Sequence, residues 1–176
     1  MKSIHLGKLF GLQISILPPA FVGTLVLWIV FIVIARSGLN IPFSQSLSMG
    51  LIATLLHWTF ELIHSLGHAY AAKRTGHPMT GITLGALAIF AITHYPKDEP
   101  ELSPAIHIRR ALGGPIISGL LSIIFYLFLP LWRGNWFWVG MFAIVENLFV
   151  YTLQIFLPLG FNDGSTILRN LRRKSS

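Results

Sequence analysis

The chain has 176 residues, of which 53% are hydrophobic and only 11% charged, and it carries a formal net charge of +7. A soluble domain has about a quarter charged residues, so the composition excludes an ordinary soluble domain and indicates a multi-pass membrane protein in the lipid bilayer. The chain contains no cysteine, which excludes disulfides and thiolate metal ligands. Because the basic residues flank apolar runs, we attribute the positive charge to membrane topology and expect no binding of nucleic acid.

Four apolar runs predict an all-α membrane domain spanning 1–176, with transmembrane helices at roughly 14–35, 47–72, 111–129 and 136–157. The short segment before the first helix is either a strand or an interfacial segment. The one long connection covers 73–110, and its stretch near 79–95 is rich in Ile, Thr and Gly. That composition predicts a small β-hairpin or re-entrant segment. A basic tail follows at 166–176.

The distribution of basic residues predicts the orientation of these helices. If the N-terminus is cytoplasmic, only Arg36 and Arg133 of the 13 Lys and Arg residues fall on outside loops. Cytoplasmic loops carry the excess of Lys and Arg in membrane proteins. We therefore expect both termini and the 73–110 loop to be cytoplasmic, in the plasma membrane of a prokaryote.

Titratable side chains inside the second span form a regular stripe. His57, Glu61, His64 and His68 follow one another at spacings of four, three and four residues, so they share one face of a helix. A charge at the bilayer centre costs about 2.5–3.5 kcal/mol on insertion scales, and such groups face the protein interior and find partners. Four of them on one face are hard to explain as packing.

Two histidines four residues apart on a helix can hold one metal ion, as they do in the H-E-x-x-H motif. The alternative is that His64 and His68 are hydrogen-bonded packing residues. Asp163 follows the fourth span at a matching depth, and two His with one carboxylate and an open position form the ligand set of a catalytic zinc site. The alternative for Asp163 is the N-cap of a helix that begins at 164.

Glu146 lies in the fourth span at roughly the depth of His57. We expect the two side chains to pair or to share a water molecule. The alternative is a Glu146 protonated by desolvation and hydrogen-bonded to a neighbouring helix.

Three motifs in order resemble those of the site-2 protease family of intramembrane zinc metalloproteases, and the resemblance covers about 47–171. They are HSLGH with AYAA at 64–72, GGPIIS at 113–118 and LPLGFNDGS at 157–165. The resemblance implies zinc held by His64, His68 and Asp163. It also implies a substrate or partner that is a transmembrane helix of another protein, cut near the cytoplasmic face.

The chain departs from the family pattern at polar positions that the chemistry uses. Ser65 stands where the family has its general-base Glu, Ser118 stands for an Asn, and Gln154 lies beside a position that is often Asn. General-base catalysis contributes about 10²–10⁴-fold, and serine is too weak a base to supply it. We therefore expect a divergent member with bound zinc and impaired or altered catalysis.

Glu61 lies one turn before His64 and has two candidate roles. It either replaces the missing base, or it accepts a hydrogen bond from a ligating imidazole. The other residues expected around the ligands or along the substrate groove are His57, Glu146, Gly114, Ser118, Asn162 and Gln154. Two alternative functions remain open: a non-catalytic pseudoprotease that binds membrane partners through the same groove, and ion or proton conduction along the polar stripe.

Overall fold

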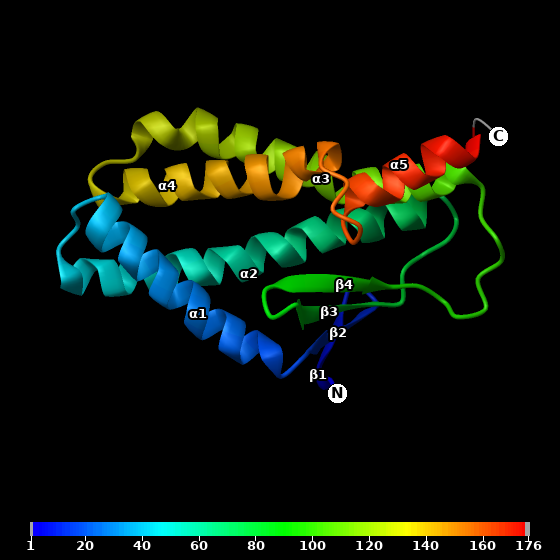
Figure 1. The fold of residues 1–176 in the computed structure, drawn as a ribbon, viewed down its shortest axis with the longest axis horizontal. Coiled ribbons are helices and arrows are strands. Elements are labelled where there is room, and N and C mark those ends of the chain that lie inside the picture. The colour runs from blue at the N-terminus through cyan, green and yellow to red at the C-terminus, as the bar shows by residue number, and fades with distance from the viewer. Residues whose placement is uncertain (1, 175–176) are drawn as a thin grey trace.

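The structure is a computed structural model that describes residues 2–174. Four long helical segments and one small sheet make up the fold (Figure 1). The helical elements are α1 (Pro19–Val33) with η1 (Ile34–Gly38), α2 (Phe43–Arg74), α3 (Pro104–Phe128) with η2 (Leu129–Leu131), α4 (Asn135–Val145) with η3 (Glu146–Thr152) and η4 (Leu153–Phe156), and α5 (Asp163–Lys174). In the view of Figure 1, α3 and α4 lie on one side of α2, and α1 and the sheet lie on the other.

Four helical segments are long and apolar enough to cross a membrane: Pro19–Gly38, Phe43–Arg74, Pro104–Leu131 and Asn135–Phe156. The predicted number of spans agrees with this, but the helices do not all begin where the predicted spans begin. The first helix begins at Pro19 rather than 14, because the residues before it form a strand. The third begins at Pro104 rather than 111, since proline suits the first helical turn and Arg110 finds partners inside the fold.

The predicted hairpin near 79–95 is present as two strands of a larger sheet. The strands are β1 (Ile4–Leu9), β2 (Leu12–Ile16), β3 (Gly81–Ala86) and β4 (Phe90–His94), in the order β1-β2-β3-β4. β2 and β3 are parallel, and the two outer pairs are antiparallel. The predicted basic tail belongs to α5 up to Lys174, and its residues 175–176 lie outside the described part of the chain.

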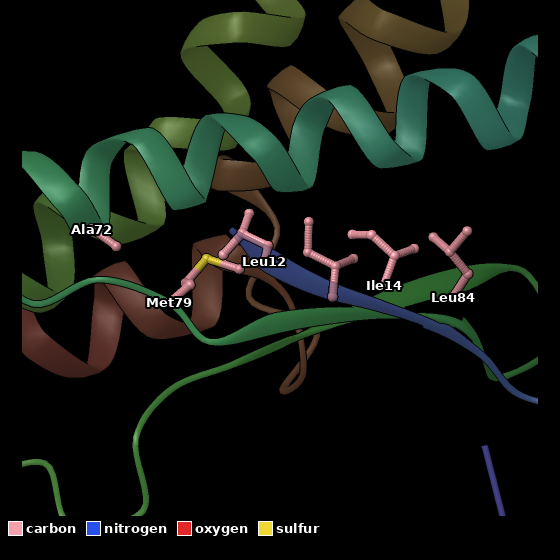
Figure 2. Packing of buried hydrophobic residues seen from close by; sticks show 6 residues of the cluster. Leu12, Ile14, Ala72, Met79 and Leu84 are labelled. Carbon is pink, nitrogen blue, oxygen red and sulfur yellow. The ribbon is translucent and has the colours of Figure 1, made fainter. Parts of the chain in front are cut away.

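One face of the sheet packs against the second half of α2 (Figure 2). Alternate residues of β2 and β3 point toward the helix, as expected for the period of two in a strand. The buried cluster comprises Leu12, Ile14, Ala72, Met79, Ile82 and Leu84, and Trp58, Leu62, Leu66 and Ala69 of α2 pack around it. This contact places the sheet beside the stripe of α2 that carries the histidines.

Two hydrogen bonds donated by tryptophan side chains fix the position of α1 along the length of α2. The indole N–H of Trp58 donates to Thr24 Oγ1 at 2.9 Å, and that of Trp28 donates to the Leu47 carbonyl at 3.0 Å. The helices are therefore antiparallel, and Pro19, five residues before Thr24, lies about level with Ile63, five residues after Trp58. The 20-residue segment from Pro19 matches the thickness of a bilayer core, roughly 30 Å. His64, the residue after Ile63, therefore lies about level with the start of α1, next to the sheet.

Candidate metal centre

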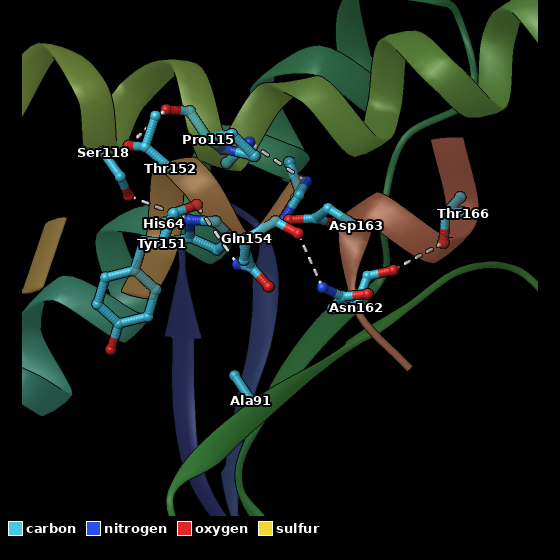
Figure 3. Close-up of polar contacts among 12 residues, drawn as sticks. His64, Ala91, Pro115, Ser118, Tyr151, Thr152, Gln154, Asn162, Asp163 and Thr166 are labelled. Atoms are coloured by element: carbon cyan, nitrogen blue, oxygen red, sulfur yellow. Dashed lines mark hydrogen bonds and ion pairs between the residues drawn. The ribbon is translucent and has the colours of Figure 1, made fainter. Parts of the chain in front are cut away.

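Three side chains from two distant parts of the chain converge on one point. His64 Nε2 lies 3.1 Å from His68 Nε2 and 3.2 Å from Asp163 Oδ2, and His68 Nε2 lies 3.3 Å from Asp163 Oδ1. Figure 3 shows Asp163, at the start of α5, facing His64. Both imidazoles are buried.

These separations fit a metal ion. Ligand atoms in a tetrahedral zinc site, each about 2.0–2.1 Å from the ion, lie about 3.3–3.4 Å from one another. The His64–His68 distance and the two distances from the histidines to Asp163, which run to different carboxylate oxygens, fall close to that value. Two His and one carboxylate also match the ligand set of zinc sites that leave a fourth position open.

A hydrogen-bond partner at Nδ1 of each imidazole orients the ring so that its Nε2 points toward the centre. His68 Nδ1 donates to the backbone carbonyl of Arg110 at 2.8 Å, and His64 Nδ1 lies 3.1 Å from the Ser118 hydroxyl. A carbonyl only accepts, so the proton of His68 is on Nδ1, and the Ser118 hydroxyl is placed to accept the Nδ1 proton of His64. Each Nε2 lone pair is then free for a metal, as is usual for ligating histidines.

Glycines let α3 pass close enough to α2 to make these contacts. A Cβ on Gly67 would lie 2.5 Å from the Gly113 carbonyl oxygen, and a Cβ on Gly113 would collide with the Gly67 carbonyl. Small residues at such crossings allow membrane helices to approach closely. Gly114 keeps the centre open, since a Cβ there would lie 2.5 Å from Nε2 of both His64 and His68.

Asn162, not Asp163, caps α5. Its Oδ1 accepts the backbone N–H of Ser165 at 3.2 Å, and its Nδ2 donates to the carbonyls of Gln154 and Leu157 at 3.0 and 2.6 Å. The capping alternative for Asp163 is therefore wrong, and its carboxylate is free to face the histidines.

The ionisation of Asp163 follows from its surroundings. Burial opposes ionisation, but the contacts with His64 and His68 outweigh it and lower the pKa of Asp163 to about 2. The side chain is thus an anion at neutral pH.

A cavity of about 560 Å³ opens onto the three side chains. Its walls come from β4, the start of α3, the segment η3–η4 and the loop before α5. Ser65 and Glu61 of α2 lie in the wall, and so do Gln154 and Asn162. Figure 3 shows Ala91 of β4 across this space from Tyr151 and Gln154.

Glu61 does not bind a ligating imidazole, so that expectation is wrong. Its Oε1 accepts the backbone N–H of Ala91 in β4 at 2.6 Å, and both imidazole Nδ1 atoms have other partners. Its Oε2 is buried without a hydrogen-bond partner among the described residues. The role of Glu61 as a base stays a prediction.

His57 and Glu146 are in direct contact. His57 Nδ1 lies 2.5 Å from Glu146 Oε1, and His57 Nε2 donates to the Ile89 carbonyl at 2.8 Å. The stripe on α2 is therefore divided: His57 and Glu61 face the β3–β4 hairpin, and His64 and His68 face Asp163.

Two residues near the centre were not predicted from the sequence. Arg110 offers its carbonyl to His68, and its guanidinium binds Glu99 at 2.5 and 2.9 Å, but in the sequence it reads only as a charge flanking a span. Tyr151 is 1% exposed, and its ring centre lies 5.2 Å from that of His64. In the sequence, Tyr151 stands out only as a polar aromatic residue within an apolar run.

No family model and no curated protein matches the chain. A solved structure does: the site-2 protease from Methanocaldococcus jannaschii matches with a TM-score of 0.63 and 22% sequence identity over 98% of this chain and 73% of that one. The chain therefore has a site-2-protease-like fold, with four long apolar helices and a small four-stranded sheet, as befits a multi-pass membrane protein.

Proposed function

We propose that the protein is a site-2-protease-like intramembrane metalloprotein that binds one zinc ion through His64, His68 and Asp163, with proteolysis impaired or altered by Ser65. The observation that carries the proposal is the convergence of three donor side chains, whose nearest atoms lie 3.1–3.3 Å apart, with a hydrogen-bond partner at Nδ1 of both imidazoles. When bound by such a set, zinc acts as a Lewis acid and lowers the pKa of water.

Ser65 cannot serve as the general base that takes up a proton during hydrolysis. Its hydroxyl is far too weak a base at neutral pH, and general-base catalysis contributes about 10²–10⁴-fold. Glu61 is a carboxylate in the same cavity wall, and its Oε2 has no hydrogen-bond partner within the described chain. We assign Glu61 as the substitute base of whatever turnover remains.

The cavity supports an apolar segment of another membrane protein as substrate or partner. Phe90 of β4, Phe149 and Val150 of η3, and Leu159 and Phe161 of the following loop line it. The histidine pair lies near the end of the membrane thickness set by α1, which gives water access to the centre.

Ser65 also favours a second function, that of a pseudoprotease that holds such a segment without cutting it. Loss of the base at Ser65 removes proton transfer but leaves the cavity and the three donor side chains in place. Partner capture that survives loss of a metal ligand in Asp163→Ala, with no cleavage by the parent, would favour this function.

Repair of the base tests the proposal. Protein reconstituted with candidate single-span membrane helices is compared with Ser65→Glu, and with Ser65→Gln as a control of equal size without a base. We expect Ser65→Glu to raise cleavage by about 10²–10⁴-fold and Ser65→Gln to leave it unchanged. Zinc-loaded Ser65→Glu that cleaves none of the helices would contradict the assignment of impairment to Ser65.

A further inference from the structure

A buried imidazole outside the metal centre is held between two oxygen atoms. His57 Nδ1 lies 2.5 Å from Glu146 Oε1, and Nε2 lies 2.8 Å from the carbonyl oxygen of Ile89. His57 is 4% exposed and Glu146 5%. Three elements meet here: α2, η3 and the β3–β4 hairpin.

This arrangement requires two protons. A neutral imidazole has one N–H and one lone pair. The carbonyl of Ile89 accepts the proton on Nε2, so a second proton must lie between Nδ1 and Glu146 Oε1, whichever of the two atoms carries it. Without it, the Nδ1 lone pair would face a carboxylate at 2.5 Å. The other polar groups close to His57 are the Tyr151 hydroxyl, 3.4 Å from Nδ1, and Glu61 one turn along α2.

The hairpin turn next to Ile89 needs outside support. Leu87 and Ala88 have φ values of +46° and +72°, in the left-handed region that non-glycine residues rarely adopt. Hairpin turns of this kind usually contain Asn or Gly. The turn is packed against Gly23 of α1, where a Cβ would collide with the carbonyl of Ala88. α1 thus holds the turn on one side, and His57 holds it on the other.

A second contact continues the attachment along β4. Ala91 N–H donates to Glu61 Oε1 at 2.6 Å. Ile89 and Ala91 are two residues apart in an extended chain, about 6.6 Å, and His57 and Glu61 are one turn apart on α2, about 6 Å. The two spacings match, so β4 is aligned along α2.

We propose that His57, oriented by its hydrogen bond to residue 146, pins the β3–β4 hairpin to α2 through Nε2–H and the Ile89 carbonyl, and thereby sets the position of β4, one wall of the cavity. His57 and Glu146 are positioning residues for that wall. The proposal rests on the contacts of the hairpin and is independent of metal binding and of proteolysis.

The cysteine-free chain permits a direct test. Spin labels on Leu87→Cys in the hairpin turn and Tyr126→Cys on α3, both exposed positions, report one distance by double electron–electron resonance. The double variant His57→Phe with Glu146→Leu replaces the polar pair by apolar side chains, which buried pairs often tolerate, but cannot bind the Ile89 carbonyl. Glu146→Gln keeps the pin, because its amide N–H donates to Nδ1 while Nε2–H still donates to Ile89. Thr59→Ala, exposed on α2, is the control.

We expect a narrow distance distribution in the parent, in Glu146→Gln and in Thr59→Ala, and roughly a doubled width in the apolar double variant. Zinc content should stay the same in all of them, which separates release of the hairpin from loss of the fold. An unchanged distribution in the double variant would overturn the proposal. A broadened distance distribution in Glu146→Gln would also overturn the proposal. The two variants are separate tests, because the result of each can be interpreted without the other.

Discussion

Gly114 shows at the scale of one residue how the centre is kept open. An added Cβ would lie 2.5 Å from Nε2 of both His64 and His68. We expect Gly114→Ala to weaken zinc binding by at least about 10–100-fold, the loss seen when groups around a metal site are disturbed. Titration of purified protein with zinc measures this.

The matched control for that experiment is Gly119→Ala on the same helix. A Cβ there would lie 3.5 Å from Thr152, an ordinary contact distance, so zinc affinity should be retained. Equal zinc affinity in Gly114→Ala and the parent would place the ion elsewhere.

Sequence spacing and the family resemblance predict the residues that form the centre better than they predict the groups that hydrogen-bond to those residues. His64 and His68 are visible because four residues is one helical turn, and Asp163 because its motif follows theirs in order. The Arg110 carbonyl that holds His68 is not visible, since any residue offers a carbonyl. Its role depends on the crossing of α2 and α3, which is a long-range contact. The partner of Glu61 was mispredicted for the same reason, because β4 comes from a distant part of the chain.

At the scale of elements, the loop between β4 and α3 is held to the helices by the ion pair of Glu99 with Arg110. Glu99 accepts two hydrogen bonds from Arg110 at 2.5 and 2.9 Å, and Arg110 also donates to the His77 carbonyl and lies over the Tyr95 ring. The Arg110 guanidinium holds the pKa of Glu99 below its ordinary value. The pair therefore joins the loop to the start of α3 and to the segment that follows α2.

The lowered pKa of Glu99 gives a pH dependence. A carboxyl whose pKa is lower in the folded state adds stability above its unfolded pKa, and that stability is lost as the pH falls through the folded value. We expect thermal stability to fall on acidification from about pH 5 to pH 3 more steeply in the parent than in Glu99→Gln. Glu101→Gln is the control, because its partner Arg173 lies in an exposed pair. Parallel pH profiles for the parent and Glu99→Gln would contradict this.

Among the elements, helices were predictable and strand pairing was not. Long apolar runs mark α1 to α4 directly. The first predicted start lies before Pro19 because strand β2 precedes α1, and the third lies after Pro104 because the first turns of α3 are polar. The parallel pairing of β2 with β3 joins segments more than sixty residues apart. No local pattern specifies such a pairing, because each strand alone has only a short alternation of apolar and polar residues.

At the scale of the whole molecule, an even number of spans puts both ends of the chain on one side of the membrane. Only Arg36 and Arg133 would lie on the other side among the 13 Lys and Arg residues. We expect a membrane-impermeant maleimide to label Gly38→Cys in intact cells and Asp98→Cys only after permeabilisation, as the bias of basic residues predicts. The reverse pattern would invert the topology and place the cavity on the outer side.

The central claim is that His64, His68 and Asp163 bind zinc, and the most direct test is the zinc content of purified protein. Elemental analysis should give about one zinc per chain in the parent and in the loop control Asp98→Ala, and almost none in Asp163→Ala. A well-folded parent that takes up no zinc, or an Asp163→Ala variant that keeps it, would contradict the claim and leave a metal-free membrane scaffold with the same fold.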